Sequence, residues 1–360
     1  MDRRSIIKNA GIAGVLAAGA APAVHAQPAV RWRLASSFPK SLDTLFGGSE
    51  LMANAVKSMS GGKFEISVHA AGELMPGFGV FDGVSAGTVQ MCHTASYYFY
   101  GKNPAFALAC AVPFGFNARQ MDAWMMHGNG RKLVNEFFAG FGVMSFAGGN
   151  TGCQMGGWFR KEIKTTEDLK GLKMRFGGGL IGDVMSKAGV VPQSIPAGDV
   201  YQSLEKGTLD AAEWIGPYDD LKLGFNKVAP YYYYPGWWEG GPELSMMVNQ
   251  KAFNDLSADN KAILQGAMSM AHNDILAKYD AFNPNALKTL VASGTKVLPF
   301  SQALMETGFK NTQEVFEENN AKSPEWKKIY ADMRNFQRDQ VLWFRFAENR
   351  FDNFMSGVKL

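Results

Sequence analysis

Arg175 has the residue type and the setting to bind a carboxylate. It lies near the end of a short predicted strand, residues 173–176, and three glycines follow at 177–179. Glycines at a strand end let the backbone approach a ligand closely, and a guanidinium fixed there can donate two parallel hydrogen bonds to an acid. A structural ion pair with Asp168 or Glu213 is the alternative, and residue type alone favours it.

Two glutamates could hold a hard cation nearby. Glu213 and Trp214 end the strand predicted from Leu209, and Glu239 follows an aromatic run at 231–238. Carboxylate oxygens together with a backbone carbonyl suit Na⁺ or Ca²⁺. A glutamate on a surface loop is the other interpretation of Glu239.

Two amide side chains follow another predicted strand, residues 143–146. Asn150 comes directly after the glycines 148–149, and Gln154 lies four residues further on. Their amide groups can donate to a carboxylate or 2-oxo group, or coordinate a cation through oxygen. Asn150 could instead adopt the left-handed conformation of a turn.

Tyrosines follow the third predicted strand, residues 89–92. Tyr97, Tyr98 and Tyr100 can donate hydrogen bonds while their rings exclude water from a site. The aromatic run at 231–238 is predicted to be a loop that walls the pocket or lines a subunit contact. Plain core packing is the alternative for many of these rings.

These residues need an α/β framework, and the chain has its pattern. Strands and helices alternate, which favours a parallel, doubly wound sheet with ligands at the carboxyl ends of strands. A second α/β unit follows, and two such lobes joined by crossing strands form a hinged clamp around a cleft. The expected strands are 30–35, 64–68, 89–92, 143–146, 173–176, 209–214, 244–248 and 295–300, and the expected helices include 42–60, 78–86, a single helix over 118–138, 181–187 and most of the chain beyond 257.

Composition excludes several functions. The net charge of the 360 residues is only +3, which argues against nucleic-acid or anionic-membrane binding.

Residues 1–26, with Arg3 and Arg4 before an apolar stretch, are predicted to be a twin-arginine export signal. The three cysteines, Cys92, Cys110 and Cys153, are expected to be buried free thiols, although one disulfide with a thiol left over stays open. No catalytic or nucleotide-binding motif occurs, so we expect a binding protein and not an enzyme.

Four segments resemble one family. LKGLKMRFGG at 169–178, EKGTLDAAEW at 205–214, the segment 150–154 and the aromatic tract 231–240 are similar to the extracytoplasmic solute receptors of TRAP transporters. The tract 231–240 resembles the branch that binds 2-oxo acids or lactate. The resemblance implies a two-lobe periplasmic binding-protein fold with a helical C-terminal extension, and it implies delivery of a small carboxylate to a membrane permease.

The resemblance also implies roles for single residues. Arg175 would bind the ligand carboxylate, and Na⁺ or Ca²⁺, with Na⁺ favoured, would bridge ligand and protein. The implied ligand-binding residues are Arg175, Asn150, Gln154, Tyr97, Tyr98, Tyr100 and Glu213, and the implied metal ligands are Gln154, Glu213, the Trp214 carbonyl and Glu239.

The resemblance implies a pyruvate-like 2-oxo acid as the ligand, and one arginine without a second fixed cation agrees with it, because such a site suits a monoacid. Lactate or another 2-hydroxy acid bound with calcium stays open, as does a secreted metal-dependent enzyme acting on 2-oxo acids. We expect a first lobe over 27–150 with a return strand at 244–249, and a second lobe over 151–243. The mainly helical segment 250–360 would pack on both lobes and could form a homodimer contact.

Overall fold

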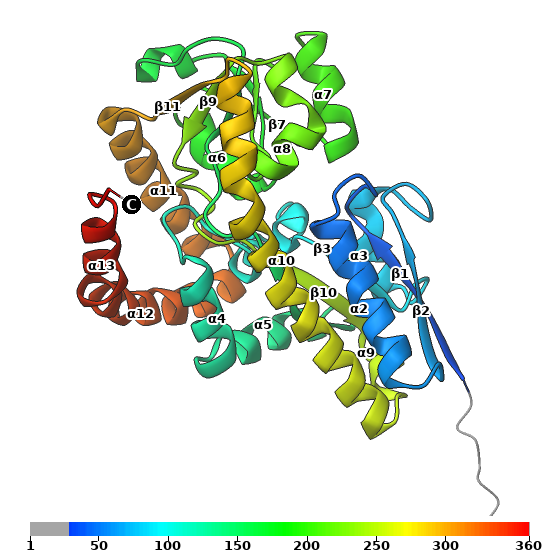
Figure 1. The fold of residues 1–360 in the computed structure, drawn as a ribbon. Coiled ribbons are helices and arrows are strands. Elements are labelled where there is room, and N and C mark those ends of the chain that lie inside the picture. Colours follow the sequence, from blue (N-terminus) through cyan, green and yellow to red (C-terminus); the bar gives the residue numbers. More distant parts are fainter. Residues whose placement is uncertain (1–28, 360) are drawn as a thin grey trace, which may run out of the picture.

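Two β-sheets with helices around them form the protein (Figure 1). The computed structural model describes residues 29–359, so the predicted export signal lies outside the described residues. Each sheet and its helices make one lobe, as the sequence predicts. We call the lobe that begins with β1 the first lobe and the other the second lobe.

The sheet of the first lobe is mixed. Its strands β1, β2 and β3 are parallel, as the alternation of strands and helices predicts, but β10 runs antiparallel between β3 and β4. A late part of the chain therefore returns to complete the sheet. In spatial order the strands are β2 (Phe64–His69), β1 (Val30–Ser36), β3 (Met91–Thr94), β10 (Glu243–Asn249) and β4 (Val143–Asn150).

The sheet of the second lobe has six short strands. Strand β5 is antiparallel to both of its neighbours, whereas β6 pairs in parallel with β7 and β8. In spatial order the strands are β11 (Lys296–Pro299), β9 (Tyr231–Tyr234), β5 (Gly157–Phe159), β8 (Ala211–Ala212), β6 (Lys173–Arg175) and β7 (Val191–Gln193).

Helices cover both sheets. Those of the first lobe are α2 (Leu45–Met59), η1 (Gly77–Gly79), α3 (Val80–Ser85), η2 (Ser96–Phe99), η3 (Pro104–Ala109), α4 (Ala118–His127) and α5 (Gly130–Ala139). Those of the second lobe are η4 (Thr166–Leu169), α6 (Gly179–Ser186), α7 (Ala197–Glu205), α8 (Pro217–Leu223) and η5 (Phe225–Lys227).

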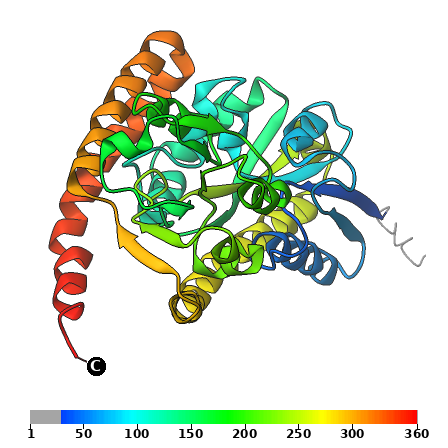
Figure 2. The same ribbon diagram turned by 90° about the horizontal axis from the view of Figure 1, so that it is seen from above.

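The last part of the chain is mainly helical and contacts both lobes. Helix α10 packs against α2 and β4 of the first lobe and against α8 of the second. Helix α11 packs on α6, whereas α12 packs on α4 and α5, and Figure 2 shows the last helices, in orange to red, in a row along one side. No helix within residues 29–359 is long and apolar enough to span a bilayer. The helices are α9 (Gln250–Asn254), α10 (Ala258–Ala292), α11 (Gln302–Lys322), α12 (Pro324–Phe346) and α13 (Glu348–Met355).

The single helix predicted over 118–138 is wrong. It is divided into α4 and α5 at Gly128, which has extended backbone angles (φ −91°, ψ −158°). The Trp124 ring packs against Gly130, where a Cβ would lie only 2.6 Å from the ring. Two glycines within three residues have low helix propensity, and the packing of Trp124 requires the break.

Two further expectations need correction. The first half of the predicted aromatic loop is a strand, β9, which pairs with β5 and β11, because tyrosine fits a pleated surface well. The cysteines are all free thiols, but Cys153 is exposed whereas Cys92 and Cys110 are buried as expected.

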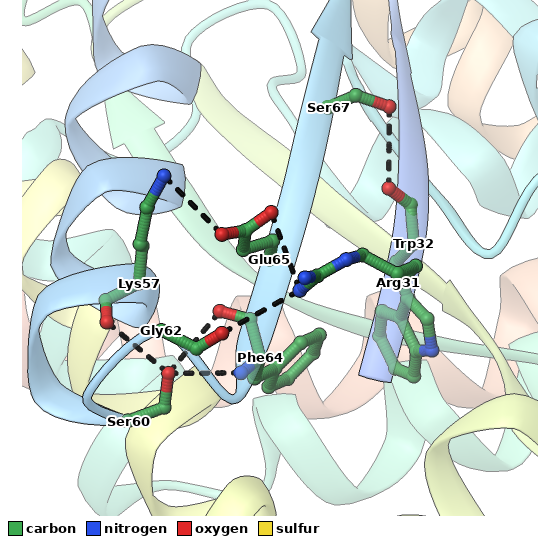
Figure 3. A network of polar contacts seen from close by, with 8 residues as sticks. All are labelled: Arg31, Trp32, Lys57, Ser60, Gly62, Phe64, Glu65 and Ser67. Atoms are coloured by element: carbon green, nitrogen blue, oxygen red, sulfur yellow. Dashed lines mark hydrogen bonds and ion pairs between the residues drawn. The ribbon is translucent and has the colours of Figure 1, made fainter. Parts of the chain in front are cut away.

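Charged side chains on the outer edge of the first lobe form a surface network (Figure 3). Glu65 on β2 accepts from Arg31 on β1 and from Lys57 on α2, both at 3.2 Å. Arg31 and Lys57 are more than half exposed, so solvent and salt screen these pairs. The network connects β1, β2 and α2 at the surface, but it contributes little to the free energy of unfolding.

We predict that Gly157→Ala destabilises the second lobe. Gly157 has a φ of +94°, and an added Cβ would lie 2.7 Å from the Ala212 carbonyl oxygen and 2.9 Å from the Cα of Glu213. The change forces β5 away from β8, so we expect a loss of roughly 1–3 kcal/mol in the free energy of unfolding by denaturant titration.

Gly171→Ala is the matched control for this prediction. Gly171 also has a positive φ, +72°, but no atom lies within 4 Å of an added Cβ. The control therefore carries backbone strain without a steric clash. Equal losses in the two variants would rule out the clash with β8 as the cause.

Candidate functional site

A buried ion pair forms the centre of the candidate site. Arg175 ends β6, and its Nη1 donates to Glu213 Oε1 at 2.8 Å and to the Glu213 carbonyl oxygen at 2.7 Å. Its Nε donates to the Ile195 carbonyl oxygen at 3.0 Å, and the guanidinium carbon lies 4.8 Å from the centre of the Trp214 ring. Arg175 and Glu213 are 1% and 0% exposed. These contacts fix the plane of the guanidinium within the core.

Three oxygen atoms beside this pair lack partners. Glu213 Oε2, Glu239 Oε2 and Gln154 Oε1 are buried, and none has a hydrogen-bond partner within the described residues. Buried polar atoms are almost always satisfied, so three orphaned acceptors in one place indicate a missing positive group. Two carboxylates and one amide form an oxygen set of the kind that Na⁺ and Ca²⁺ prefer.

The pKa values of the two glutamates reflect an excess of negative charge. Burial raises the pKa of Glu213 to about 7, although the charge of Arg175 opposes this shift. Burial and the nearby Glu213 raise the pKa of Glu239 well above its ordinary range. One guanidinium therefore does not offset both carboxylates, and a bound cation would stabilise their ionised forms.

Backbone hydrogen bonds bring the three oxygen-bearing segments together. The Gln154 N–H donates to the Glu239 carbonyl at 3.1 Å, and the Met155 N–H donates to the Ile215 carbonyl at 2.9 Å. The Gly236 N–H donates to the Gln154 carbonyl at 2.8 Å. Segments 154–155, 213–215 and 236–239, which are distant in the sequence, are thus held in one arrangement.

A small cavity adjoins this cluster and is lined by residues from both lobes. Its lining combines polar groups with apolar side chains, as a small acid with a short carbon chain requires. The lining residues are Phe38, Leu45, Ala95, Tyr97, Tyr98, Thr151, Gln154, Arg175, Trp214, Ile215, Pro242 and Leu244.

Five of the residues predicted from the sequence line the cavity: Tyr97, Tyr98, Gln154, Arg175 and Trp214. Burial raises the pKa of both tyrosines, so their hydroxyls remain protonated donors. Tyr97 also packs over the glycines after Arg175, because a Cβ on Gly177 would lie 2.8 Å from the Tyr97 hydroxyl oxygen. These glycines let the two lobes approach each other at the cavity.

Two predicted residues lie elsewhere. The Tyr100 hydroxyl donates to Asp183 at 2.8 Å and accepts from Asn319 at 3.1 Å, so it joins η2 to α6 and α11 outside the cavity. Asn150 accepts from the Gly152 N–H at 2.9 Å and donates to the Gly241 carbonyl at 3.0 Å. Its amide fixes the turn that leads to Gln154, but Asn150 itself ends β4 and does not adopt the left-handed conformation considered for it.

Sequence reasoning missed several apolar residues of the cavity. Phe38 and Leu45 follow β1, and Leu244 lies near the start of β10. The rule that ligands bind beyond the carboxyl ends of parallel strands would have identified Phe38. Leu244 gives no such signal, because only the return of β10 into the first sheet brings it to the cavity.

No group of three or more His, Cys, Asp or Glu side chains within residues 29–359 could hold a metal ion. The oxygen cluster does not conflict with this, because it combines two glutamates with an amide. His93, the histidine nearest the predicted site in sequence, bonds Ser49 and the Gly148 carbonyl at 2.8 Å each. It is a satisfied core residue.

Comparison with known proteins places the chain in a family. A model of the bacterial extracellular solute-binding proteins of family 7, named DctP, matches residues 35–323. The monocarboxylate 2-oxoacid-binding periplasmic protein of Nostoc sp. is 46% identical over 364 aligned residues, which cover 99% of this chain and 100% of that protein.

Solved structures agree with this result. A TRAP transporter solute-binding protein of Bordetella bronchiseptica is 48% identical with a TM-score of 0.90, and the match covers 91% of this chain and 98% of that one. It is a mixed-occupancy dimer with copurified calcium and picolinate in one active site. A protein of Pseudoalteromonas atlantica with bound sodium and pyruvate is 40% identical with a TM-score of 0.87, and the match covers 92% of this chain and 100% of that one. The two-lobe fold predicted from the sequence is thereby confirmed, and the chain belongs to the DctP family of bacterial extracellular solute-binding proteins, which are receptors of TRAP transporters and not enzymes.

Proposed function

We propose that the chain is a periplasmic receptor for a small 2-oxo monocarboxylate such as pyruvate, bound together with Na⁺ or Ca²⁺. One observation carries the proposal: three orphaned buried oxygens, of Gln154, Glu213 and Glu239, lie beside a buried arginine. The naming of the Nostoc relative and the pyruvate in the Pseudoalteromonas structure support this ligand class.

Arg175 would hold the ligand carboxylate. Its hydrogen bonds to protein use Nε and Nη1, and Nη2 makes none within the described residues. An N–H of Nη2 can therefore donate to the acid, and the tyrosine hydroxyls of 97 and 98 can donate beside it. The apolar side chains of the cavity would enclose the carbon chain of the ligand and exclude water.

The cation would be held by Gln154, Glu213, Glu239 and the Trp214 carbonyl. When bound, the ion supplies positive charge that offsets the second carboxylate and attracts the ligand's carboxylate and 2-oxo oxygens. A 2-hydroxy acid such as lactate presents similar oxygens, so it remains the second candidate. The oxygen on the second carbon distinguishes the two acids, because a 2-oxo oxygen only accepts hydrogen bonds whereas a 2-hydroxyl group can also donate one. Selectivity would therefore depend on whether the pocket offers a donor or an acceptor at that oxygen.

Delivery and assembly complete the proposal. Export by the twin-arginine route through residues 1–26 would place the receptor in the periplasm, where closure of the lobes over the ligand precedes its transfer to the membrane permease. The helices α12 and α13 carry exposed apolar side chains that would suit a homodimer contact. The exposed residues are Val341, Leu342, Trp343, Phe346, Phe351 and Phe354.

We predict that Arg175→Lys weakens pyruvate binding at least a hundredfold. Lysine keeps the charge that pairs with Glu213 but cannot donate in the planar geometry of a guanidinium, and charge-assisted bonds contribute about 1.5–3 kcal/mol each. Isothermal titration calorimetry with pyruvate and calcium measures the change. Arg160→Ala, at an exposed arginine of the same lobe, is the control and should bind as the wild type does. Unchanged affinity in Arg175→Lys would remove the guanidinium from the site.

We predict that Glu239→Gln lowers the affinity for calcium and makes pyruvate binding insensitive to it. The variant keeps the side-chain volume but removes one of the two charges that would hold the ion. Titration of the chelator-treated protein with calcium, followed by pyruvate, measures both effects.

Glu243→Gln is the matched control for the metal prediction. Glu243 is also a buried glutamate with an unpartnered oxygen, but His272, Asp122 and Arg131 are the charged groups that influence its pKa. It should retain calcium binding. Equal loss in both variants would indicate a general effect of removing a buried charge.

We predict that the metal-free protein loses stability as the pH rises from about 4.5 to about 8. Burial raises the pKa of Glu213 from 4.5 to about 7 and that of Glu243 from 4.5 to about 8. The folded chain therefore keeps protons that the unfolded chain has released, so this contribution is complete below the unfolded pKa and is lost as the pH passes the folded pKa.

Calcium should reverse this trend, because it competes with protons for Glu213 and Glu239. Thermal unfolding midpoints at several pH values, with chelator and with excess calcium, test the prediction. The shift produced by calcium should grow with pH over the same window. A calcium shift that stays constant with pH would argue against ion binding by these carboxylates.

A further inference from the structure

Two adjacent buried aspartates at the start of α8 make their hydrogen bonds to different parts of the molecule. Asp220 Oδ2 accepts from Trp158 Nε1 at 2.9 Å and from the Tyr232 hydroxyl at 2.7 Å, and both partners belong to the sheet of the second lobe. Asp220 Oδ1 accepts from the Ile215 N–H at 3.3 Å. Asp220 thus anchors the segment after Trp214 to its own lobe.

Asp219 bonds the other lobe. Its Oδ1 accepts from the Thr44 hydroxyl at 2.8 Å, across 175 residues of sequence, and its Oδ2 accepts from the Tyr279 hydroxyl at 2.7 Å. Thr44 directly precedes α2 of the first lobe, and Tyr279 lies on α10, which packs on both lobes. Both Asp219 and Thr44 are fully buried. Hydroxyl bonds to a buried carboxylate are stronger than bonds between neutral groups.

The hydroxyl of Thr44 does not cap the helix that follows it. A threonine before a helix usually caps it, but the Thr44 side chain makes no cap bond to α2. Its bond to Asp219 is therefore independent of the helix that it precedes, so removal of the hydroxyl should leave α2 intact.

This contact lies next to the ligand cavity on both sides. Leu45, the neighbour of Thr44, lines the cavity from the first lobe, and Trp214 and Ile215, just before α8, line it from the second. The bond between Thr44 and Asp219 thus joins segments that line the cavity from the two lobes, although neither residue lines the cavity itself.

A second, outer contact joins the same elements. Asp43 forms an ion pair with Lys222 and accepts from the Tyr218 hydroxyl at 3.0 Å. The Asp43 side chain is 56% exposed, so solvent screens this pair. The buried bond of Asp219 is the stronger of the two links.

We infer that Asp219 is a positioning residue whose bond to Thr44 clasps the lobes in the closed, ligand-binding state. Loss of the bond weakens ligand binding although neither residue touches the ligand. The inference rests on the proposed function and adds to it a coupling between closure of the lobes and the segment that bears Glu213 and Trp214.

The test compares Thr44→Val with Thr44→Ser. Valine has the shape of threonine without the hydroxyl, and it leaves Asp219 Oδ1 without its donor, whereas serine restores the donor. Calorimetric titration with calcium and pyruvate should give about tenfold weaker binding for Thr44→Val and an affinity within about twofold of the wild type for Thr44→Ser. Asp43→Asn, which removes the outer ion pair, should have a smaller effect than Thr44→Val.

A measurement of the interlobe distance separates clasping from a general structural role. Spin labels at Lys63→Cys in the first lobe and Lys206→Cys in the second, both exposed positions, report the distance after the exposed Cys153 is replaced by serine. Calcium with pyruvate should shift the wild type and Thr44→Ser to the short distance, whereas Thr44→Val should keep a larger open population.

The outcomes distinguish the two proposals. A wild type that binds pyruvate, together with a Thr44→Val variant of unchanged affinity and closure, overturns the clasp and leaves the receptor proposal standing. A wild type that does not bind pyruvate overturns the proposed ligand. The unliganded distance distributions then decide on the clasp: a larger open population in Thr44→Val supports it, and identical distributions overturn it.

Discussion

The buried pair of Arg175 and Glu213 is the constraint on which the site depends. Removal of two charges from water costs more than a loose pairing returns, so such a pair persists only with good geometry and further hydrogen bonds. The carbonyls of Ile195 and Glu213 and the ring of Trp214 supply that support. Glu239 adds a carboxylate that the pair cannot neutralise. The rest of the site is arranged around this uncompensated charge.

The charged groups of the site and part of its aromatic and apolar lining come from different parts of the chain. The groups that bear charge belong to the second lobe and to the segments that cross between the lobes, whereas Phe38, Leu45 and the tyrosines belong to the first. An open form would leave the charged groups in water, where their interactions with a ligand are weak. Closure over the charged groups lowers the local dielectric and excludes competing water, so affinity and lobe position are physically linked.

The sequence predicts the framework and most of the polar site, but not the direction of every side chain. Strand ends followed by glycines identify Arg175, and the orphaned oxygens of Gln154, Glu213 and Glu239 lie where the resemblance places a cation. From the sequence, Arg175 could either bind a ligand or form an ion pair with Glu213. In the structure it forms the ion pair and its side chain also lines the cavity. Tyr100 lies outside the cavity because the direction of its side chain depends on packing against α6 and α11, which no local sequence pattern encodes. The break at Gly128 and the strand β9 likewise depend on the tertiary packing of Trp124 and on pairing with β5.

The place of β10 in the first sheet has a consequence for biosynthesis. This strand lies between β3 and β4, although about a hundred residues separate it in sequence from β4. A ribosome that has produced only the residues up to β4 has therefore made a sheet that lacks the strand between β3 and β4, and both of these strands offer unpaired backbone groups to other chains. Completion of the first sheet has to wait until the whole sheet of the second lobe except β11 has been synthesised. Until then, the incomplete first sheet exposes strand edges of the kind that favour aggregation.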